Sequence, residues 1–304
     1  MNHQNKILAA LVCIFIYQSS AKGQSISRSD FLRESQQADR FGVEGHWDIA
    51  KNILLRLVAS PYAREHEYTE LAYCYLNALP GKTEYSLAER YARKALSLNP
   101  EAGHACAALA ELAIERNDYE GSIQLATRAL NCKPPDKYAG YLRARCYVAL
   151  HKYNEALRDL EQWDICVTKT DKSQTTVKMQ GEILEKMGST DAAIKKYKAD
   201  SPYHPEQATK NVVRCLQKEG KYREAIVEVS TLIKRNAEDS DAYNLRASLK
   251  AQAKDWKGAI ADYDHAINLS PTSTYYKNRA QAYEALGQTK LAKQDLANAE
   301  KSSF

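Results

Sequence analysis

The chain has 304 residues, of which 27% are charged, and the charges are spread along its length. It contains only 12 glycines and 8 prolines and has no runs of alternating apolar and polar residues, so its composition excludes a disordered chain and a β-rich fold. The formal net charge of +5 is a small excess for this length and does not indicate binding to nucleic acid.

Residues 1–23 have the plan of a secretory signal peptide. An apolar run over residues 7–17 is followed by small residues, which predicts cleavage near Ala21 or Gly23. The run is shorter than the roughly 20 residues that span a bilayer. We therefore expect a secreted or periplasmic protein with no stable membrane span after cleavage, and a short linker over residues 24–30. An uncleaved anchor and a chance apolar start are the alternatives.

Residues 241–271 contain the clearest copy of a repeated pattern. Aromatic, small and helix-stopping residues recur within it at Tyr243, Ala247, Ala259, Tyr263, Ala266 and Pro271. Apolar and small residues three or four apart place one stripe on each of two helices. Asp255 and Trp256 mark the turn between these helices, and Pro271 stops the second one.

The small residue that opens the second helix of this copy recurs along the whole chain. Its counterparts follow each other at intervals of 32 to 38 residues, at Ala50, Ala88, Ser122, Ala156, Ala193, Ala225, Ala259 and Ala292. The pattern resembles the 34-residue tetratricopeptide repeat, W-x₂-L-G-x₂-Y…A-x₃-F…P. Two positions of the clearest copy depart from it, because Arg246 stands where Leu is usual and Lys250 where Tyr is usual.

The resemblance implies an all-α fold, a right-handed α-solenoid of about eight helix–turn–helix repeats over residues 31–304. The expected repeats are approximately 31–64, 65–102, 103–136, 137–172, 173–205, 206–239, 240–272 and 273–304. Solenoids generally need capped ends. Only Ser302 to Phe304 follow the last expected helix, so this helix either serves as its own cap or forms an uncapped C-terminal end on which another molecule docks.

The sequence contains no Gly-rich phosphate loop, H-E-x-x-H, C-x-x-C or G-x-S-x-G motif. Its seven histidines are scattered, and His104 and His204 fall near expected helix starts, where a solvated or capping role is favoured over metal binding. We therefore expect no catalytic residues, no cofactor and no metal site, and a protein that is not an enzyme.

Two cysteines are candidates for a disulfide. Cys106 opens the first helix of the third expected repeat and Cys132 closes the second, so both lie at the same end of the pair. In an exported protein this places a disulfide within reach. Cys74, Cys146 and Cys215 share another position of the repeat and are expected to fill the core as small apolar residues.

Function is expected on the surface that the first helices present. In the tetratricopeptide repeat family, positions 2, 5, 9 and 12 of each first helix form most of the inner face. Here these positions give a groove of tyrosines and cations at Tyr73, Tyr138, Tyr141, Arg145, Lys178, Lys210 and Arg214. Tyrosine offers broad contact at low entropy cost and cations suit carboxylates, so the groove is expected to bind a protein or peptide with acidic groups.

The main hypothesis is therefore an exported scaffold that binds a peptide or partner helix in this groove. The alternative is a regulatory subunit or assembly factor of an envelope enzyme complex that acts through the uncapped C-terminal end. A homo-oligomer formed through the same end is left open. An enzyme is disfavoured because the sequence contains no convergent nucleophile–base or metal-binding set.

Overall fold

The structure is a computed structural model that describes residues 26–77, 82–166, 174–200 and 204–302. The expected signal peptide at residues 1–23 lies outside these residues. Over the described ranges every regular element is an α-helix, so the prediction of an all-α fold is confirmed. The helices divide into two compact units, Met1–Thr168 and Lys169–Phe304.

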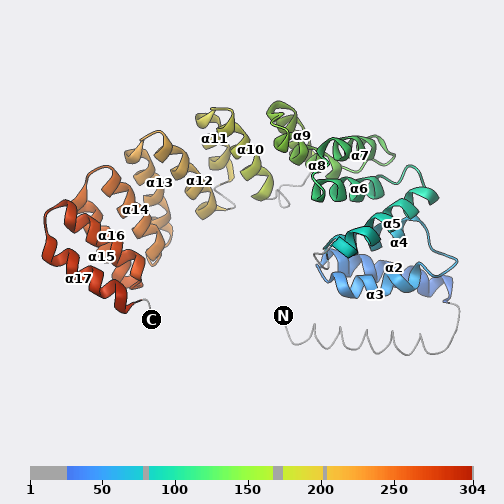
Figure 1. Ribbon diagram of the computed structural model, residues 1–304, viewed down its shortest axis with the longest axis horizontal. Coiled ribbons are helices and arrows are strands. Elements are labelled where there is room, and N and C mark those ends of the chain that lie inside the picture. The colour runs from blue at the N-terminus through green and yellow to red at the C-terminus, as the bar shows by residue number, and fades with distance from the viewer. Residues whose placement is uncertain (1–25, 78–81, 167–173, 201–203, 303–304) are drawn as a thin grey trace. The chain divides into compact units, whose positions relative to one another are not determined.

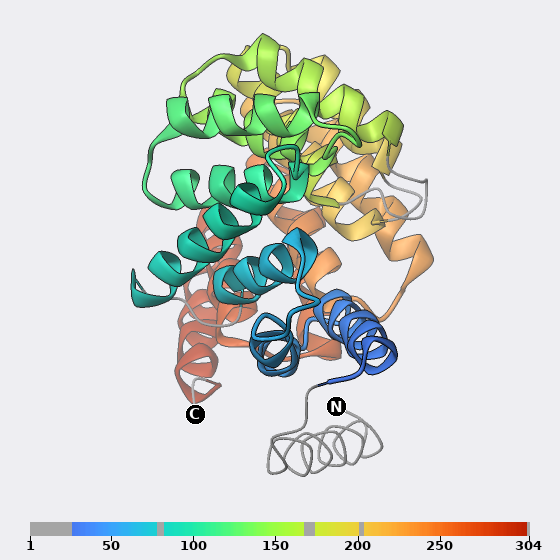
Figure 2. The same ribbon diagram turned by 90° about the vertical axis from the view of Figure 1, so that its right-hand side faces the viewer.

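Within its described residues, the first unit contains four helix–turn–helix pairs (Figure 1; Figure 2). They are α2 (Arg28–Val43) with α3 (Trp47–Leu57), α4 (Glu65–Asn77) with α5 (Lys82–Leu98), α6 (Gly103–Glu115) with α7 (Tyr119–Asn131), and α8 (Tyr138–Ala149) with α9 (Tyr153–Cys166). The first helix begins inside the segment 24–30, which was expected to be a linker, because Ser27 caps it by accepting a hydrogen bond from Asp30 N.

The described part of the second unit also contains four pairs. They are α10 (Gln174–Lys186) with α11 (Thr190–Asp200), α12 (Pro205–Lys218) with α13 (Tyr222–Arg235), α14 (Ser240–Gln252) with α15 (Trp256–Leu269), and α16 (Ser273–Ala285) with α17 (Thr289–Lys301). Over the described residues the two units therefore hold eight helix pairs, consistent with the expected number of about eight repeats.

The small residues that define the repeat are the places where the two helices of a pair pack most closely. All eight are at most 1% exposed, at Ala50, Ala88, Ser122, Ala156, Ala193, Ala225, Ala259 and Ala292. A larger side chain at such a crossing would force the helices apart. The one serine in this series is accommodated because its Oγ donates a hydrogen bond to Ala110 O at 2.8 Å.

A residue with positive φ lies in the turn of seven pairs, two positions beyond the end of the first helix. The φ values lie between 58° and 78°, at Gly45, Asn117, His151, Gly188, Gly220, Lys254 and Gly287. This conformation suits glycine, which has no Cβ, and asparagine tolerates it better than most residues. In two turns an aspartate then starts the second helix, since Asp118 and Asp255 accept hydrogen bonds from Gly121 N and Gly258 N, each at 3.0 Å.

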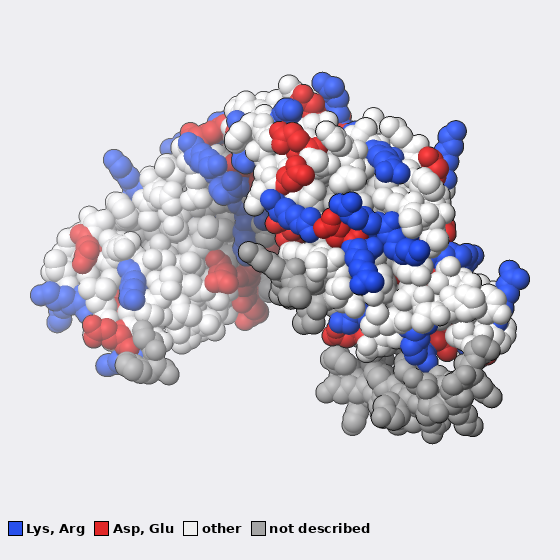
Figure 3. All heavy atoms as spheres, turned by 45° about the vertical axis from the view of Figure 1, so that its right-hand side comes forward, with Lys and Arg blue, Asp and Glu red and all other residues white. Residues whose placement is uncertain are grey.

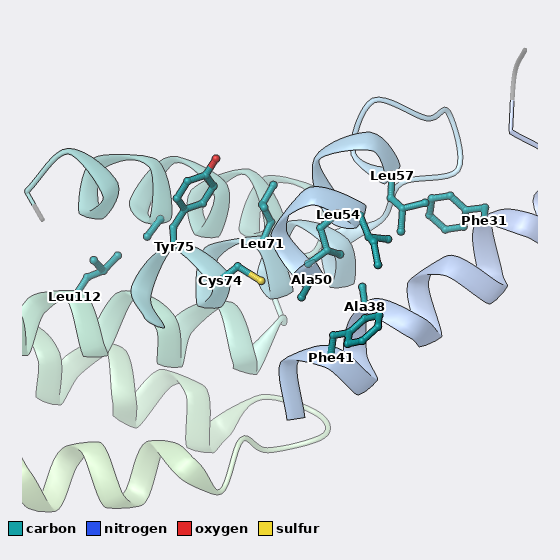
Figure 4. Packing of buried hydrophobic residues seen from close by; sticks show 12 residues of the cluster. Phe31, Ala38, Phe41, Ala50, Leu54, Leu57, Leu71, Cys74, Tyr75 and Leu112 are labelled. Atoms are coloured by element: carbon teal, nitrogen blue, oxygen red, sulfur yellow. The ribbon is translucent and has the colours of Figure 1, made fainter. Parts of the chain in front are cut away.

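The largest core cluster of the first unit joins its first three pairs. Phe31 and Phe41 of α2, Leu57 of α3 and Leu71 of α4 belong to one buried cluster that extends to Leu112 of α6 (Figure 4). Each pair thus buries its apolar stripe against the next, as stacked repeats do.

Buried ion pairs join the two helices of three pairs. Arg143 binds Asp159, Arg246 binds Asp262 and Arg279 binds Asp295, each through two hydrogen bonds of 2.7–2.8 Å. The departure of Arg246 from the usual leucine is therefore compensated by an aspartate on the facing helix.

Candidate functional site

The predicted groove residues divide between the two units. Tyr73, Tyr138, Tyr141 and Arg145 lie in the first unit, on α4 and α8, while Lys178, Lys210 and Arg214 lie in the second, on α10 and α12. We call the surface formed by positions 2, 5, 9 and 12 of the first helices of a unit its first-helix face. In the first unit, neighbouring first helices contact each other directly, α4 with α6 and α6 with α8.

An aromatic cluster closes the first-helix face of the first unit at α8. The rings of Tyr138 and Tyr141 are stacked with their centroids 5.8 Å apart. The indole ring of Trp163, from α9, lies 6.1 Å from the first ring and 6.3 Å from the second. These separations are typical of favourable aromatic pairs. Sequence reasoning found both tyrosines but did not assign Trp163 to the site, because it occupies a position of the second helix where alanine is usual.

A carboxylate and a cation border this cluster. Tyr138 donates a hydrogen bond of 3.5 Å to Glu111 Oε1. Burial raises the pKa of Glu111, and the positive charge of Arg145 acts against this shift. Among the residues that the structure describes, Arg145 forms no ion pair and no hydrogen bond. The N–H donors of its guanidinium group are therefore not used within the described residues.

Tyr73 has a different place on the same face. Its hydroxyl donates a hydrogen bond to His104 O at 3.3 Å, and burial raises its pKa well above the usual value. The side chain thus joins α4 to α6, so its hydroxyl hydrogen is already donated within the unit.

Two histidines of the first helices, one on α4 and one on α6, pair with carboxylates of other segments of the unit. His66 Nε2 is 3.0 Å from Asp39 Oδ1, and His104 Nδ1 is 3.0 Å from Asp136 Oδ2. The sequence interpretation of His104 as a solvated or capping residue missed this partner, which is 3% exposed. A signal was present, because the two histidines occupy position 2 of consecutive repeats. Glu70 lies near both histidines. Burial raises the pKa of its carboxyl group, and positive charge on either histidine acts against this shift.

We expect the stability of the first unit to decrease as the pH rises through about 8. The hydrogen bond to Asp39 raises the pKa of His66 to about 8, although burial acts in the opposite direction. Because the folded pKa exceeds the unfolded value of about 6.5, the stabilisation is complete below about pH 6.5 and is lost above the folded pKa. Both side chains are partly solvated, with 43% and 39% of their area exposed, so the loss should be about 1 kcal/mol or less.

Denaturant unfolding at pH 6 and pH 9 measures this effect in the parent, in His66→Gln and in a control. The control is His265→Gln, an exposed histidine of the second unit with no carboxylate partner among the described residues. His66→Gln should reduce the pH dependence of the first unit, and the control should keep it. An equal dependence in all three proteins would show that this pair does not contribute.

The second unit places its three predicted cations in unequal environments. Arg214 is engaged, since its two Nη atoms donate to Glu185 at 2.8 and 2.7 Å, and Lys218 Nζ contacts the same carboxylate at 2.8 Å. Burial would raise the pKa of Glu185, but the hydrogen bonds from Lys218, Tyr197 and Arg214 lower it.

The two lysines predicted for the groove of the second unit, Lys178 and Lys210, are less engaged than Arg214. Lys178 is 3.9 Å from Glu182, a distance that allows only a weak surface interaction. Lys210 is exposed and lines a shallow pocket of about 310 Å³ with His204 and Gln207. Lys210 is therefore the more available of the two for an anionic group.

Cys106 and Cys132 lie together, as the sequence indicated, but the structure has both as free, buried cysteines. Burial raises the pKa of Cys106 to about 11, and a hydrogen bond with Cys132 contributes in the same direction. Cys132 Sγ also donates to Arg128 O at 3.3 Å. The disulfide stays a prediction for the oxidised protein.

Within the described ranges, His, Cys, Asp and Glu side chains form no group of three or more that is suited to a metal ion. None of the described helices combines the length and the apolar character that a membrane span requires.

The comparisons with known proteins agree with this architecture. One tetratricopeptide repeat model matches residues 82–146 in the first unit, and another matches residues 214–274 in the second. The C-terminal part of a tetratricopeptide repeat protein from Cytophaga hutchinsonii is 22% identical, with a TM-score of 0.51 over 64% of this chain and 78% of that one. A chain of the Cut9–Hcn1 hetero-tetramer is 15% identical, with a TM-score of 0.51 over 84% of this chain and 48% of its own.

At these identities the structural matches show the fold alone. The family matches fall in both units, and the intervals between the buried small residues repeat the family's period throughout the described chain. The chain is a member of the tetratricopeptide repeat family.

Proposed function

We propose that the chain is a non-catalytic, exported scaffold that binds a segment of a partner protein on the first-helix face of its first unit. The tetratricopeptide repeat fold supports a protein–protein interaction scaffold. The observation that carries the more specific proposal is Arg145, a cation without a described polar partner beside the aromatic cluster of Tyr138, Tyr141 and Trp163.

The chemistry of this face defines the segment that it would bind. An aromatic or aliphatic side chain would cover the rings of the cluster, and a carboxylate would receive the donors of Arg145. Toward α4 the face also carries carboxyl groups, Glu70 on α4 and Asp39 on α2, and Asp39 is paired with His66. A segment with an acidic group at α8 would therefore be preferred. Taken by itself, the second unit has in the exposed Lys210 its most available predicted cation for an acidic group.

Replacing Arg145 with glutamate should weaken binding of such a segment at least about tenfold, which corresponds to about 1.4 kcal/mol. A charge-assisted contact contributes about 1.5–3 kcal/mol when partly desolvated and much less when solvated. The measurement is a titration of a partner captured from the envelope fraction, or of acidic–aromatic peptides selected on the full chain.

The matched control is Arg158→Glu, which makes the same charge change at an exposed position of α9. Both variants should unfold at the parent temperature, and only Arg145→Glu should lose affinity. If the two variants bound as the parent does, the first-helix face of this unit would not be the binding surface.

A specific observation favours the second hypothesis of a surface on α17. Leu291 and Leu296 of this helix are each 42% exposed. If affinity survived Arg145→Glu but was lost in Leu291→Glu/Leu296→Glu, the chain would act through its last described helix, as a regulatory subunit or assembly factor would.

Export is the remaining part of the proposal, and its support is the sequence plan of residues 1–23. N-terminal sequencing of the native protein tests it. A mature chain that begins after Ala21 or Gly23 would support export, and an intact Met1 on cytoplasmic material would contradict it.

A further inference from the structure

A pocket of about 600 Å³ lies in the first unit between α5, α6 and α7. Its apolar lining consists mainly of four leucines, Leu96, Leu109, Leu112 and Leu125, all buried or partly buried. A volume of this size is typical of ligand sites, which span about 300–1,000 Å³. Leu109 lines the pocket, whereas Glu111, two residues later on α6, lies about 200° away around the helix axis. The pocket is therefore separate from the first-helix face.

Three arginines border this pocket, one from α5, one after α6 and one from α7. They are Arg93, Arg116 and Arg128. Figure 3 shows Lys and Arg side chains gathered on the face of the first unit that is turned to the viewer, with a few acidic ones among them. A pocket with an apolar lining and a cationic border suits a ligand that is itself both apolar and anionic.

The two carboxylates in the pocket lining, Glu89 and Asp118, do not neutralise the charge of the three arginines. Glu89 receives Arg93 Nη2 at 2.7 Å and Arg116 Nη2 at 2.6 Å, so one carboxylate serves two guanidinium groups. Asp118 accepts the hydrogen bond from Gly121 N that starts α7. Arg128 donates to Pro100 O at 2.7 Å, a neutral acceptor that leaves its charge uncompensated.

The contacts of Glu89 show that a carboxylate fits between two of these arginines. Arg93 and Arg116 hold the carboxylate of Glu89 between them, with half or more of each arginine side chain still exposed, 71% and 50%. A guanidinium group has five N–H donors in a planar fork that matches a carboxylate. Arg116 and Arg128 therefore have donors left for carboxylates of another molecule.

We propose that this pocket is a second docking site, which binds a short acidic segment of a partner protein. An aliphatic side chain of the segment lies among the four leucines, and its carboxylates contact Arg116 and Arg128. A ligand that fits this pocket carries one apolar group and at least two anionic groups spaced around it. Alternating residues of a single strand or turn have this arrangement, so we expect the ligand to be a peptide segment. The site is independent of the first-helix face, so a scaffold with both could hold two segments together.

The test uses the full chain and a fluorescently labelled eight-residue peptide in which leucine alternates with aspartate or glutamate. Fluorescence anisotropy should show saturable binding that weakens with salt, because part of the charged border is exposed. The double variant Arg116→Gln/Arg128→Gln should weaken binding at least about tenfold. Ser97→Phe, which adds a ring at an exposed position of the lining, should weaken binding without removing a charge.

Two controls separate this site from the proposed function. The titration is repeated in an Arg145→Gln background, where the first-helix face has lost its cation, and there Arg116→Gln/Arg128→Gln should still weaken binding at least about tenfold. Peptides with serine for leucine or glutamine for the acids should bind weakly. The proposal is overturned if the peptide does not bind, or if it binds the arginine double variant equally well. It is also overturned if inorganic phosphate or vesicles of anionic phospholipid bind at these arginines and the peptide does not.

Discussion

Replacing Asp262 with asparagine is expected to lower the free energy of unfolding of the second unit by about 2–4 kcal/mol. Asp262 is 3% exposed, and its carboxylate accepts hydrogen bonds from Arg246 Nε and Nη2 at 2.8 and 2.7 Å. Lys250 Nζ lies 2.7 Å from the same carboxylate. Burial would raise the pKa of Asp262, but the hydrogen bonds from both cations lower it. Asparagine keeps the size of the side chain and removes the charge that compensates the two cations.

The expected loss is large because the two cations cannot simply return to water. Only 20% of each side chain is exposed in the folded unit, so an unpaired charge would stay largely desolvated. Denaturant unfolding gives the change in free energy, and hydrogen exchange should locate the loss of protection in α14 and α15.

Asp191→Asn is the matched control, since it makes the same chemical change in the same unit at a side chain that is 92% exposed. Its partner Lys221 lies 3.9 Å away, so its loss should cost less than about 0.5 kcal/mol. Equal unfolding free energies for Asp262→Asn and the parent would show that the buried network contributes nothing to stability.

The same ion pairs show which part of the structure could be predicted from the sequence and which part could not. Arg246 was recognised as a departure from the family pattern, and its consequence was not. The signal lies in the recurrence, since arginine is followed sixteen residues later by aspartate at Arg143, at Arg246 and at Arg279. Position 7 of the first helix faces the second helix of the same pair, so a charge there requires a partner at that spacing. A single copy of the repeat cannot reveal the rule, whereas three aligned copies can.

Prediction of the fold succeeded because the repeat depends on local spacing. Small residues such as Ala156 and Ala259 have one steric role in every repeat, and they are fully buried where the period places them. The candidate site was only partly predictable. The period gave Tyr138, Tyr141 and Arg145, which lie near one another. It could not indicate that Arg214 is engaged, because that contact depends on a glutamate of the preceding repeat.

Gly181→Ala is expected to destabilise the second unit by about 2–4 kcal/mol, although alanine is the better helix former. A Cβ at this position would overlap Cε1 and Cζ of the Tyr197 ring and would lie 2.6 Å from its hydroxyl oxygen. Tyr197 is 1% exposed and donates a hydrogen bond of 3.0 Å to Glu185, so a shift of the ring would disturb buried contacts and this hydrogen bond. Its displacement would disturb the packing of α10 on α11 and the carboxylate that holds Arg214.

Gly140→Ala makes the same substitution in α8, where the added Cβ would meet only Leu130 Cδ2 at 3.9 Å and Asp159 O at 4.0 Å. These are ordinary contacts, so this control should be neutral or stabilising by up to about 1 kcal/mol. A second change, Tyr197→Leu, should reduce the cost of Gly181→Ala, because the shorter side chain vacates the space that the Cβ needs. The double variant should therefore lose less than the two single losses combined, a coupling that unfolding of all four proteins measures. If Gly181→Ala were as stable as the parent, or if the two losses simply added, close contact between Gly181 and the ring would not explain the glycine.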